Sequence, residues 1–209
     1  RLCSSAASDV YKRQGWERAN WFAPSKELQK DDWSFRRSKW FNHVGNECIN
    51  VQDNAGLLDM TAFAKCRISG PGAEEFLDYL VANKIPKKIG RVNLCHALNT
   101  AGGVHSEFTI AKEKENSFYL VSAGAYQRLD HDWIHKWMPK DGSVIYENLT
   151  NSMGVLVLAG PKSRDILSKI TKTDLSNENF PWLSSKKINV GLAPSIAMRM
   201  NFVGELGWE

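Results

Sequence analysis

Apolar residues recur at helical spacing in four stretches of the chain. The clearest lies at 73–81, where apolar side chains fall at positions i, i+3, i+4, i+7 and i+8 and predict a helix with one buried face. We also expect helices at 44–54 and around 166–170. A fourth helix is predicted before Pro139, with a buried stripe formed by Tyr126, Leu129, Trp133 and Trp137.

Shorter apolar or alternating runs between these helices predict β-strands. They lie at 57–60, 64–68, 91–99, 104–111, 118–122, 155–159 and 196–202. Two strands are each followed by a Gly-Pro pair and a helix, at Gly70-Pro71 and again 90 residues later at Gly160-Pro161. Proline suits the first turn of a helix, because its missing N–H would have no partner there. The repeated order predicts an α+β fold built from two similar halves.

The chain divides into four segments. Residues 4–14 look like a translated sequencing-library adapter, so we interpret residues 1–14 as an artefactual leader. Residues 15–43 form an aromatic-rich connector, which packs either on this chain's own domain or against a preceding domain. We expect the first half of the folded domain at 44–140 and an incomplete second half at 141–209.

The composition is that of an ordinary globular protein, because 43% of the 209 residues are hydrophobic and 24% are charged. No apolar run approaches the roughly 20 residues that cross a bilayer, so we expect no membrane association. The formal net charge of +4 is small and its lysines and arginines are scattered, which argues against a nucleic-acid partner. Four cysteines at irregular spacing match neither a disulfide framework nor a CxxC metal motif and favour a reducing compartment.

Several common catalytic and metal-binding motifs are absent from the sequence. It contains no GxSxG, GxGxxG or Walker loop, so neither a serine nucleophile nor a nucleotide site is predicted. His131 and His135 have the i, i+4 spacing of a helical zinc site, but no third ligand follows them. The predicted buried stripe would also leave both histidines largely on the solvated side of their helix. We therefore predict no metal site.

Two segments combine turn glycines with carboxylates. Residues 99–103 predict a hairpin connection, after which alternate side chains of the returning strand face opposite sides. Glu107 would share one side with His105 and Thr109, whereas Phe108 would face the other way. The second segment, GELGWE, places two carboxylates four residues apart around paired glycines. Taken alone, each segment fits either a solvated turn or a binding site.

Five ordered motifs together resemble a known family. They are GWERANWF at 15–22, AGLLDMTAFAKCRISGP at 55–71, LNTAGGVHSEFTIA at 98–111, VLVLAGPKSRDIL at 155–167 and RMNFVGELGWE at 199–209. The chain is similar to the folate-binding aminomethyltransferase-like domain of the glycine-cleavage T protein and of the C-terminal parts of dimethylglycine and sarcosine dehydrogenases. The resemblance implies a ferredoxin-like, T-protein folate-binding fold, truncated here at both ends.

The resemblance also implies that a methylene group passes from an oxidised N-methyl amine, an iminium, to tetrahydrofolate. Glu107 matches the family's acidic residue near the reactive nitrogens of folate, so it is the implied catalytic residue. Glu209 matches the carboxylate that clamps the pterin, since a carboxylate can accept from two neighbouring N–H donors. The other implied folate-binding residues are Asn99, Phe108, Thr109 and Phe202; many family members carry tyrosine at the positions of Leu94 and Phe202.

The GWER start and the Glu-Phe-Thr after the glycine turn are most similar to the dimethylglycine dehydrogenase branch. That branch implies an FAD-binding domain ahead of this one, so the implied partners are this flavin domain, a small amine substrate and folate. The implied enzyme is the longer protein, an FAD-dependent N-methylglycine-type dehydrogenase, and we expect no turnover by the given chain alone, because the flavin and half of the folate site are absent from it. Two alternatives stay open: a non-catalytic regulatory relative, like the pyruvate dehydrogenase phosphatase regulatory subunit, and a free-standing T protein. The implied location is the cytoplasm of a bacterium or the mitochondrial matrix of a eukaryote.

Overall fold

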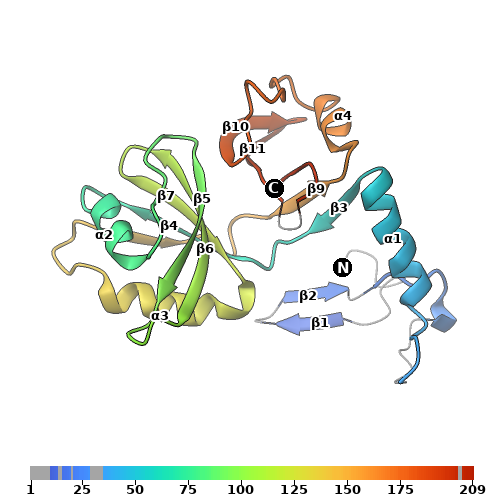
Figure 1. Cartoon of the computed structure of the whole chain (residues 1–209), viewed down its shortest axis with the longest axis horizontal. Helices are drawn as coiled ribbons and strands as arrows, with labels where there is room; N and C mark the ends of the chain where they lie inside the picture. Colours follow the sequence, from blue (N-terminus) through green and yellow to red (C-terminus); the bar gives the residue numbers. More distant parts are fainter. Residues whose placement is uncertain (1–9, 14–15, 20, 29–34, 202–203) are drawn as a thin grey trace.

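The computed structural model describes residues 10–13, 16–19, 21–28, 35–201 and 204–209 and is a mixed α and β structure with antiparallel sheets (Figure 1). The α-helices are α1 (Phe41–Asp53), α2 (Ala73–Leu80), α3 (Gln127–Trp137) and α4 (Ser163–Ser168). Two short 3-10 helices are η1 (Lys26–Leu28) and η2 (Gly124–Tyr126). The strands are β1 (Val10–Arg13), β2 (Trp16–Ala19), β3 (Gly56–Asp59), β4 (Ala64–Ser69), β5 (Val92–Leu98), β6 (Val104–Lys114), β7 (Ser117–Ser122), β8 (Ile145–Asn148), β9 (Leu156–Ala159), β10 (Ser184–Val190), β11 (Ala193–Arg199) and β12 (Gly207–Trp208).

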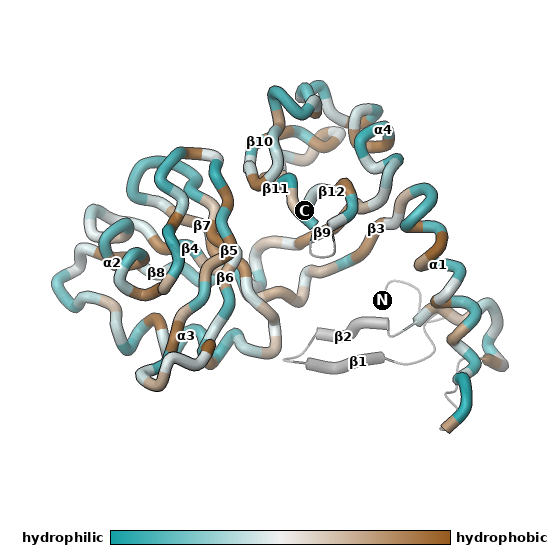
Figure 2. The backbone as a smooth tube through the Cα atoms, viewed as in Figure 1, coloured by the Kyte–Doolittle hydropathy of each residue, from teal (hydrophilic) through white to brown (hydrophobic). Residues whose placement is uncertain are grey.

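The first unit is built on a five-stranded antiparallel sheet in the order β5-β6-β7-β4-β8. Helices α2 and α3 cover one face of this sheet (Figure 1). In Figure 2, hydrophobic residues run along β5, β6 and β7, whereas the loops that join the strands are mostly hydrophilic. The opposite face of the sheet is the outer face. The core between the sheet and the helices includes Ile68, Phe76, Leu77, Phe108, Ile110, Phe118, Leu120 and Ile134.

The second unit combines the β10–β11 hairpin, the three-stranded sheet β12-β9-β3 and α4. Its own core contains Leu167, Leu175, Phe180, Ile188, Ala197 and Trp208. One edge of this unit packs on the outer face of the five-stranded sheet, where Met198 contacts the cluster that holds Val92, Ala111 and Tyr119. The second unit therefore covers part of the outer face. Glu107, farther along β6, keeps 47% of its side chain exposed.

The predicted order of strand, Gly-Pro pair and helix is confirmed in both units. It joins β4 to α2 in the first and β9 to α4 in the second. Gly70 and Gly160 adopt φ values of +111° and +117°, which side chains with a Cβ rarely tolerate. The two sheets nevertheless differ in size and do not divide at residue 140, because β8 completes the five-stranded sheet while β3 pairs with β9.

The buried stripe predicted for α3 is confirmed at Trp133 and Trp137, which are partly buried against the core of the first unit, and is wrong at Tyr126 and Leu129. Tyr126 and Leu129 are 57% and 42% exposed, whereas Asp130 and Ile134 are 4% and 1% exposed. Asp130 faces the sheet in place of Leu129, because its carboxylate accepts hydrogen bonds of 2.6 Å from the hydroxyls of Ser106 and Ser122. Burial raises the pKa of this carboxyl, and the serine hydrogen bonds oppose the shift. Apolar periodicity could not reveal a charged residue held inward by partners from other strands.

The two histidines of α3 are not both on a solvated side. Their rings stack with centroids 3.9 Å apart, and both rings form T-shaped contacts with the ring of Tyr146. Only His135 is exposed, whereas His131 is half-buried. Within the described ranges, no group of three or more His, Cys, Asp or Glu residues is arranged to hold a metal ion.

The segment before α1 shows mixed packing. Trp21 is 3% exposed and stacks on His43 of α1 at 5.8 Å, whereas Phe22 and Phe35 are exposed. Residues 10–13, inside the predicted leader, pair with β2, and the artefactual origin of the leader stays a prediction.

In the part of the chain that the structure describes, we find no helix with the length and apolar character needed to span a bilayer.

A buried lysine in the first unit leads to a prediction on acid stability. The Lys112 side chain is 4% exposed and its Nζ lies 2.7 Å from Glu74. Hydrogen bonds from Lys112 and then Lys87 hold the pKa of the Glu74 carboxyl below its ordinary value. A carboxyl with a depressed folded pKa stabilises the protein above its unfolded pKa, about 4.3, and this contribution is lost as the pH falls. Glu74→Gln should therefore lower the melting temperature more at pH 7 than at pH 3.

Differential scanning fluorimetry at the two pH values measures this effect. Glu75→Gln is the matched control, since Glu75 is the exposed neighbour in the same helical turn. An equal loss of melting temperature at pH 7 and pH 3 in Glu74→Gln would show that the ion pair contributes nothing through its charge.

Candidate functional site

Glu107 lies on the outer face of β6, opposite His96 on the neighbouring strand β5. The Nε2 atom of His96 is 2.9 Å from a carboxylate oxygen of Glu107. On its other side, the His96 ring approaches Asn83, with Nδ1 3.3 Å from the amide oxygen. The same oxygen accepts the backbone N–H of His96 at 2.8 Å. Asn83 and His96 therefore hold the Glu107 carboxylate in one orientation while half of it stays open to solvent.

The Asn83–His96–Glu107 row has a definite chemical capacity. An oxygen acceptor faces each ring nitrogen of His96, so the ring donates to both when it carries both protons. In that state it is a cation against the carboxylate, and the hydrogen bond between them is charge-assisted. A carboxylate held in this way can stabilise a cation brought to its open side or accept a proton from a ligand nitrogen.

A row of side chains crosses the outer face next to Glu107. The pairing registers align Leu94 on β5, Thr109 on β6, Val121 on β7 and Lys65 on β4. Leu94 is 47% exposed and supplies an apolar surface beside Thr109. The Lys65 ammonium donates to the Thr61 carbonyl oxygen at 2.6 Å, and burial lowers the pKa of this ammonium. The row therefore combines an apolar side chain, a hydroxyl and a cation on one face.

Glu209 lies where the second unit meets the outer face. Its backbone N–H and C=O both pair with Met198, whose side chain packs in the cluster that contains Tyr119. Burial raises the pKa of the Glu209 carboxyl. Burial also raises the pKa of Tyr119, and the charges of Glu113 and then Glu209 add to this rise. No N–H or O–H donor from the described residues bonds to the Glu209 carboxylate. A half-buried carboxylate without a donor fits a ligand that offers adjacent N–H groups.

The structure brings some of the residues predicted for the site together and separates others. Glu107 and Thr109 share the outer face, and Glu209 lies on the same side of the sheet. His105, predicted on that side as well, instead stacks on Trp133 of α3 at 3.9 Å, next to a register shift between β5 and β6. Ala111 belongs to the same buried cluster as Met198, the backbone partner of Glu209. Along β6, Glu107 and Ala111 are four residues apart, which is about 13 Å at the usual rise per residue. The Phe108 side chain is 1% exposed in the core on the opposite face, so only its backbone can reach a ligand beside Glu107.

Two further predicted residues have different outcomes. Asn99 lies at the hairpin turn, where its side-chain oxygen accepts the backbone N–H groups of Ala101 and Gly103 at 2.9 and 3.0 Å. Its side chain therefore fixes the turn that leads into β6. Phe202 lies outside the described residues.

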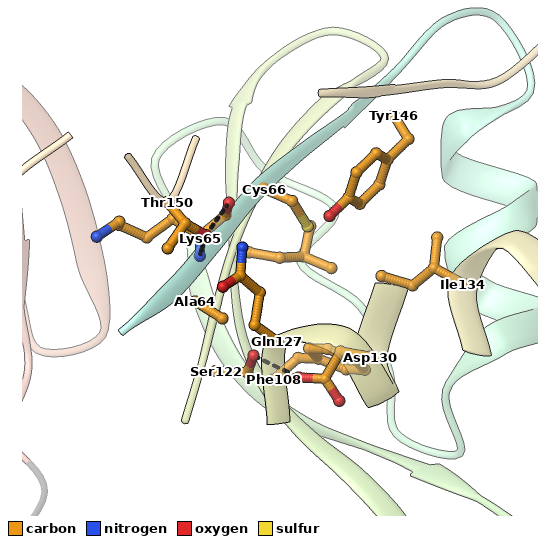
Figure 3. Close-up of a pocket in the computed structure, with 11 residues that line it drawn as sticks. Ala64, Lys65, Cys66, Phe108, Ser122, Gln127, Asp130, Ile134, Tyr146 and Thr150 are labelled. Atoms are coloured by element: carbon orange, nitrogen blue, oxygen red, sulfur yellow. Dashed lines mark hydrogen bonds between the residues drawn. The ribbon is translucent and has the colours of Figure 1, made fainter. Parts of the chain in front are cut away.

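A small cavity lies between α3 and the sheet, on the face opposite Glu107, and of the residues predicted for the site only Phe108 lines it (Figure 3). Cys66, Asp130 and Tyr146 are among the side chains around it, and the Lys65 side chain points away from it. Its volume is about 10 Å³, which is room for about one water molecule. This cavity is too small for an organic ligand.

His96 and Lys65 are the outer-face residues that the sequence analysis missed. The signal for His96 was available, because a turn at residues 99–103 pairs residues near 96 with residues near 107. Lys65 gave no such signal: its position beside Val121 depends on the pairing of β4 with β7, which are far apart in sequence.

Comparison with protein families gives one match over nearly the whole chain. A family model described as the GCVT N-terminal domain matches residues 3–209.

Two curated relatives are similar over most of this chain. The mitochondrial dimethylglycine dehydrogenase of Mus musculus is 38% identical over 197 residues, which cover 93% of this chain and 22% of that protein. The mitochondrial pyruvate dehydrogenase phosphatase regulatory subunit of Mus musculus is 31% identical over 203 residues, which cover 94% of this chain and 23% of that protein. The chain therefore spans less than a quarter of the length of either relative.

One solved structure resembles the fold. The crystal structure of the glycine cleavage system aminomethyltransferase T from Bartonella henselae superposes with a TM-score of 0.74. The superposition covers 97% of this chain and 49% of that chain at 20% identity. The likeness confirms the predicted fold.

Proposed function

The chain belongs to the GCVT N-terminal domain family, and on this basis we propose that it is the part of a longer protein that binds tetrahydrofolate and transfers a one-carbon group to it. The donor is an oxidised N-methyl amine, and the acceptor is a nitrogen of the folate. The observation that supports this proposal most directly is the placement of two carboxylates on one side of the sheet. Glu107 is oriented by His96, and Glu209 is half-buried with no donor among the described residues.

The folate supplies the secondary amine nitrogens that receive the methylene group. Glu107 stabilises the cationic iminium at its open side and then accepts the proton that the attacking nitrogen loses. The same carboxyl returns this proton to the departing amine. The second folate nitrogen loses its own proton when it closes the methylene bridge, and that proton passes to solvent, so protons balance over the transfer. His96 acts as a positioning residue, because its hydrogen bond keeps the carboxylate directed at the ligand.

The residues that would hold the folate extend from Glu107 toward Glu209. We assign the pterin to Glu209, whose carboxylate can accept from two neighbouring N–H groups. Thr109 and the backbone of Phe108 would contact the middle of the ligand, while Asn99 supports the turn that precedes them. Leu94 offers an exposed apolar surface to the same region.

A substitution at Glu209 tests the binding part of the proposal. Glu209→Gln keeps the size of the side chain but removes the charge, and a hydrogen bond to a charged group contributes about 1.5–3 kcal/mol. The affinity for tetrahydrofolate should therefore fall by about ten- to a hundredfold. Isothermal titration calorimetry under anaerobic conditions measures it, with Glu178→Gln as a control at an exposed glutamate. Unchanged affinity in Glu209→Gln would contradict the assignment of the pterin.

The parent activity proposed for the longer protein is that of a flavin-dependent dimethylglycine or sarcosine dehydrogenase. The flavin would oxidise the amine in a domain that precedes this one. The proposed location is the mitochondrial matrix in a eukaryote and the cytoplasm in a bacterium.

The similarity to the phosphatase regulatory subunit supports a second candidate, a non-catalytic regulatory domain. This candidate predicts no saturable binding of tetrahydrofolate to the chain. The same titration therefore separates the two functions.

A further inference from the structure

A groove of about 610 Å³ lies where the second unit meets the start of β5. One wall comes from residues 88–91 and the other from residues 184–187 of β10. Two backbone hydrogen bonds join the walls at the base, from Ser185 to Gly90 at 2.7 Å and from Val92 to Leu183 at 2.9 Å. The groove has the volume of a typical small-molecule site and a base fixed by backbone pairing.

The groove is independent of the proposed folate site. Glu113 lines it, six residues along β6 from Glu107, which is about 20 Å of strand. Neither Glu107 nor Glu209 is among its lining residues.

The lining of the groove is strongly cationic. It carries five cationic side chains and one carboxylate, that of Glu113. Glu113 is already paired with Arg67 at 2.7 Å, and Lys112 is paired with Glu74 at 2.7 Å. Among the residues that the structure describes, no carboxylate forms a salt bridge with the other four cations, Lys88, Arg91, Lys186 and Lys187.

On a convex surface, four such cations would simply be separate side chains that are each solvated by water. Here the four cations come from two segments more than 90 residues apart in sequence, and the paired backbone holds them against one another. Like charges that face each other across a groove repel, and their summed potential concentrates anions in the groove. Ile89, Pro181 and Ile196 add apolar surface to the same lining.

We infer that this groove binds a small ligand that carries two or more anionic groups on a partly apolar body. The anionic groups are phosphates or carboxylates, which lysines contact as point charges. The ligand would bridge Lys88 on one wall and Lys187 on the other.

Calorimetric titration of the whole chain tests this inference with two probes, inorganic tripolyphosphate for phosphates and the tripeptide Glu-Glu-Glu for carboxylates. We expect saturable one-to-one binding of at least one probe, weakened by salt. The double variant Lys88→Glu/Lys187→Glu should weaken this binding at least about tenfold. The control Arg128→Glu/Lys140→Glu makes the same change of net charge at exposed positions on and after α3 and should leave it unchanged.

Each result decides the inference. Binding of tripolyphosphate alone identifies phosphates as the ligand groups, and binding of the tripeptide alone identifies carboxylates. Saturation by neither probe, or an equal loss in the control variant, overturns the site. If the charge-reversed variant has a lowered melting temperature, Lys88→Gln/Lys187→Gln takes its place, and unchanged affinity in that variant overturns the site as well.

Discussion

Gly70→Ala is expected to lower the free energy of unfolding by about 3 kcal/mol, through backbone strain and a steric clash together. The φ of Gly70 is +111°, a conformation that residues with a Cβ rarely adopt. A Cβ at this position would clash with the backbone carbonyl oxygen of Ser143 and lie 3.2 Å from its carbonyl carbon. The backbone cannot move aside easily, because Gly72 N–H also donates to Ser143 at 3.0 Å.

Urea unfolding followed by tryptophan fluorescence measures the loss, which corresponds to a melting temperature lower by about 6–12 °C. Gly102→Ala separates strain from clash, because Gly102 has a φ of +82° but no atom within 4 Å of its Cβ position. We expect that control to lose only about 1 kcal/mol. If both variants unfold at the same urea concentration, the close approach to Ser143 does not limit the stability of the first unit.

The position of Gly70 also shows what the sequence could reveal about the fold. A Gly-Pro pair between a strand and a helical pattern is a local signal, and it was sufficient to predict both turns. The φ of the glycine and the helix start at the proline leave a local signal in the sequence, whereas the close approach of Gly70 to Ser143 does not. The exchange of β3 and β8 between the sheets could not be predicted, because it depends on pairing across the whole chain.

The hairpin that carries Glu107 was predictable for a similar reason. Asn99 and the glycines after it define the turn, and alternation along β6 then assigns Glu107 and Phe108 to opposite faces. The same alternation shows that the Phe108 side chain cannot line a ligand beside Glu107. The family resemblance had implied a contact for this residue without specifying which of its atoms would make it.

Strand β10 was missed by the sequence analysis for a physical reason. It has two serines, two lysines and an asparagine but only two apolar residues, and only Ser184 and Ile188 of its seven residues are buried. A strand at the margin of a small sheet needs few apolar residues, so its pattern resembles that of a loop. The cationic groove was missed with it, since the +4 of the whole chain says nothing about where charges converge.

Glu107→Gln is expected to slow the proposed transfer step by about 10²–10⁴-fold, the usual contribution of a positioned acid or base. Glutamine keeps the shape of the side chain and can still accept a hydrogen bond from His96, but it neither carries a negative charge nor accepts a proton. The measurement is the formation of 5,10-methylenetetrahydrofolate from tetrahydrofolate and the iminium of formaldehyde and N-methylglycine. The longer protein that contains this chain is present at saturating folate, and the reaction without protein is subtracted.

The affinity for folate separates this role from a merely structural one. If Glu107 acts on the reacting atoms, the rate falls in Glu107→Gln while the dissociation constant for tetrahydrofolate changes little, whereas Glu209→Gln changes mainly the dissociation constant. His96→Phe should give a smaller loss of rate together with an altered pH profile, because it removes the hydrogen bond that orients the carboxylate and leaves the carboxylate in place. No acceleration by the unaltered longer protein, or an undiminished rate in its Glu107→Gln variant, would refute the assignment of Glu107 as the catalytic residue.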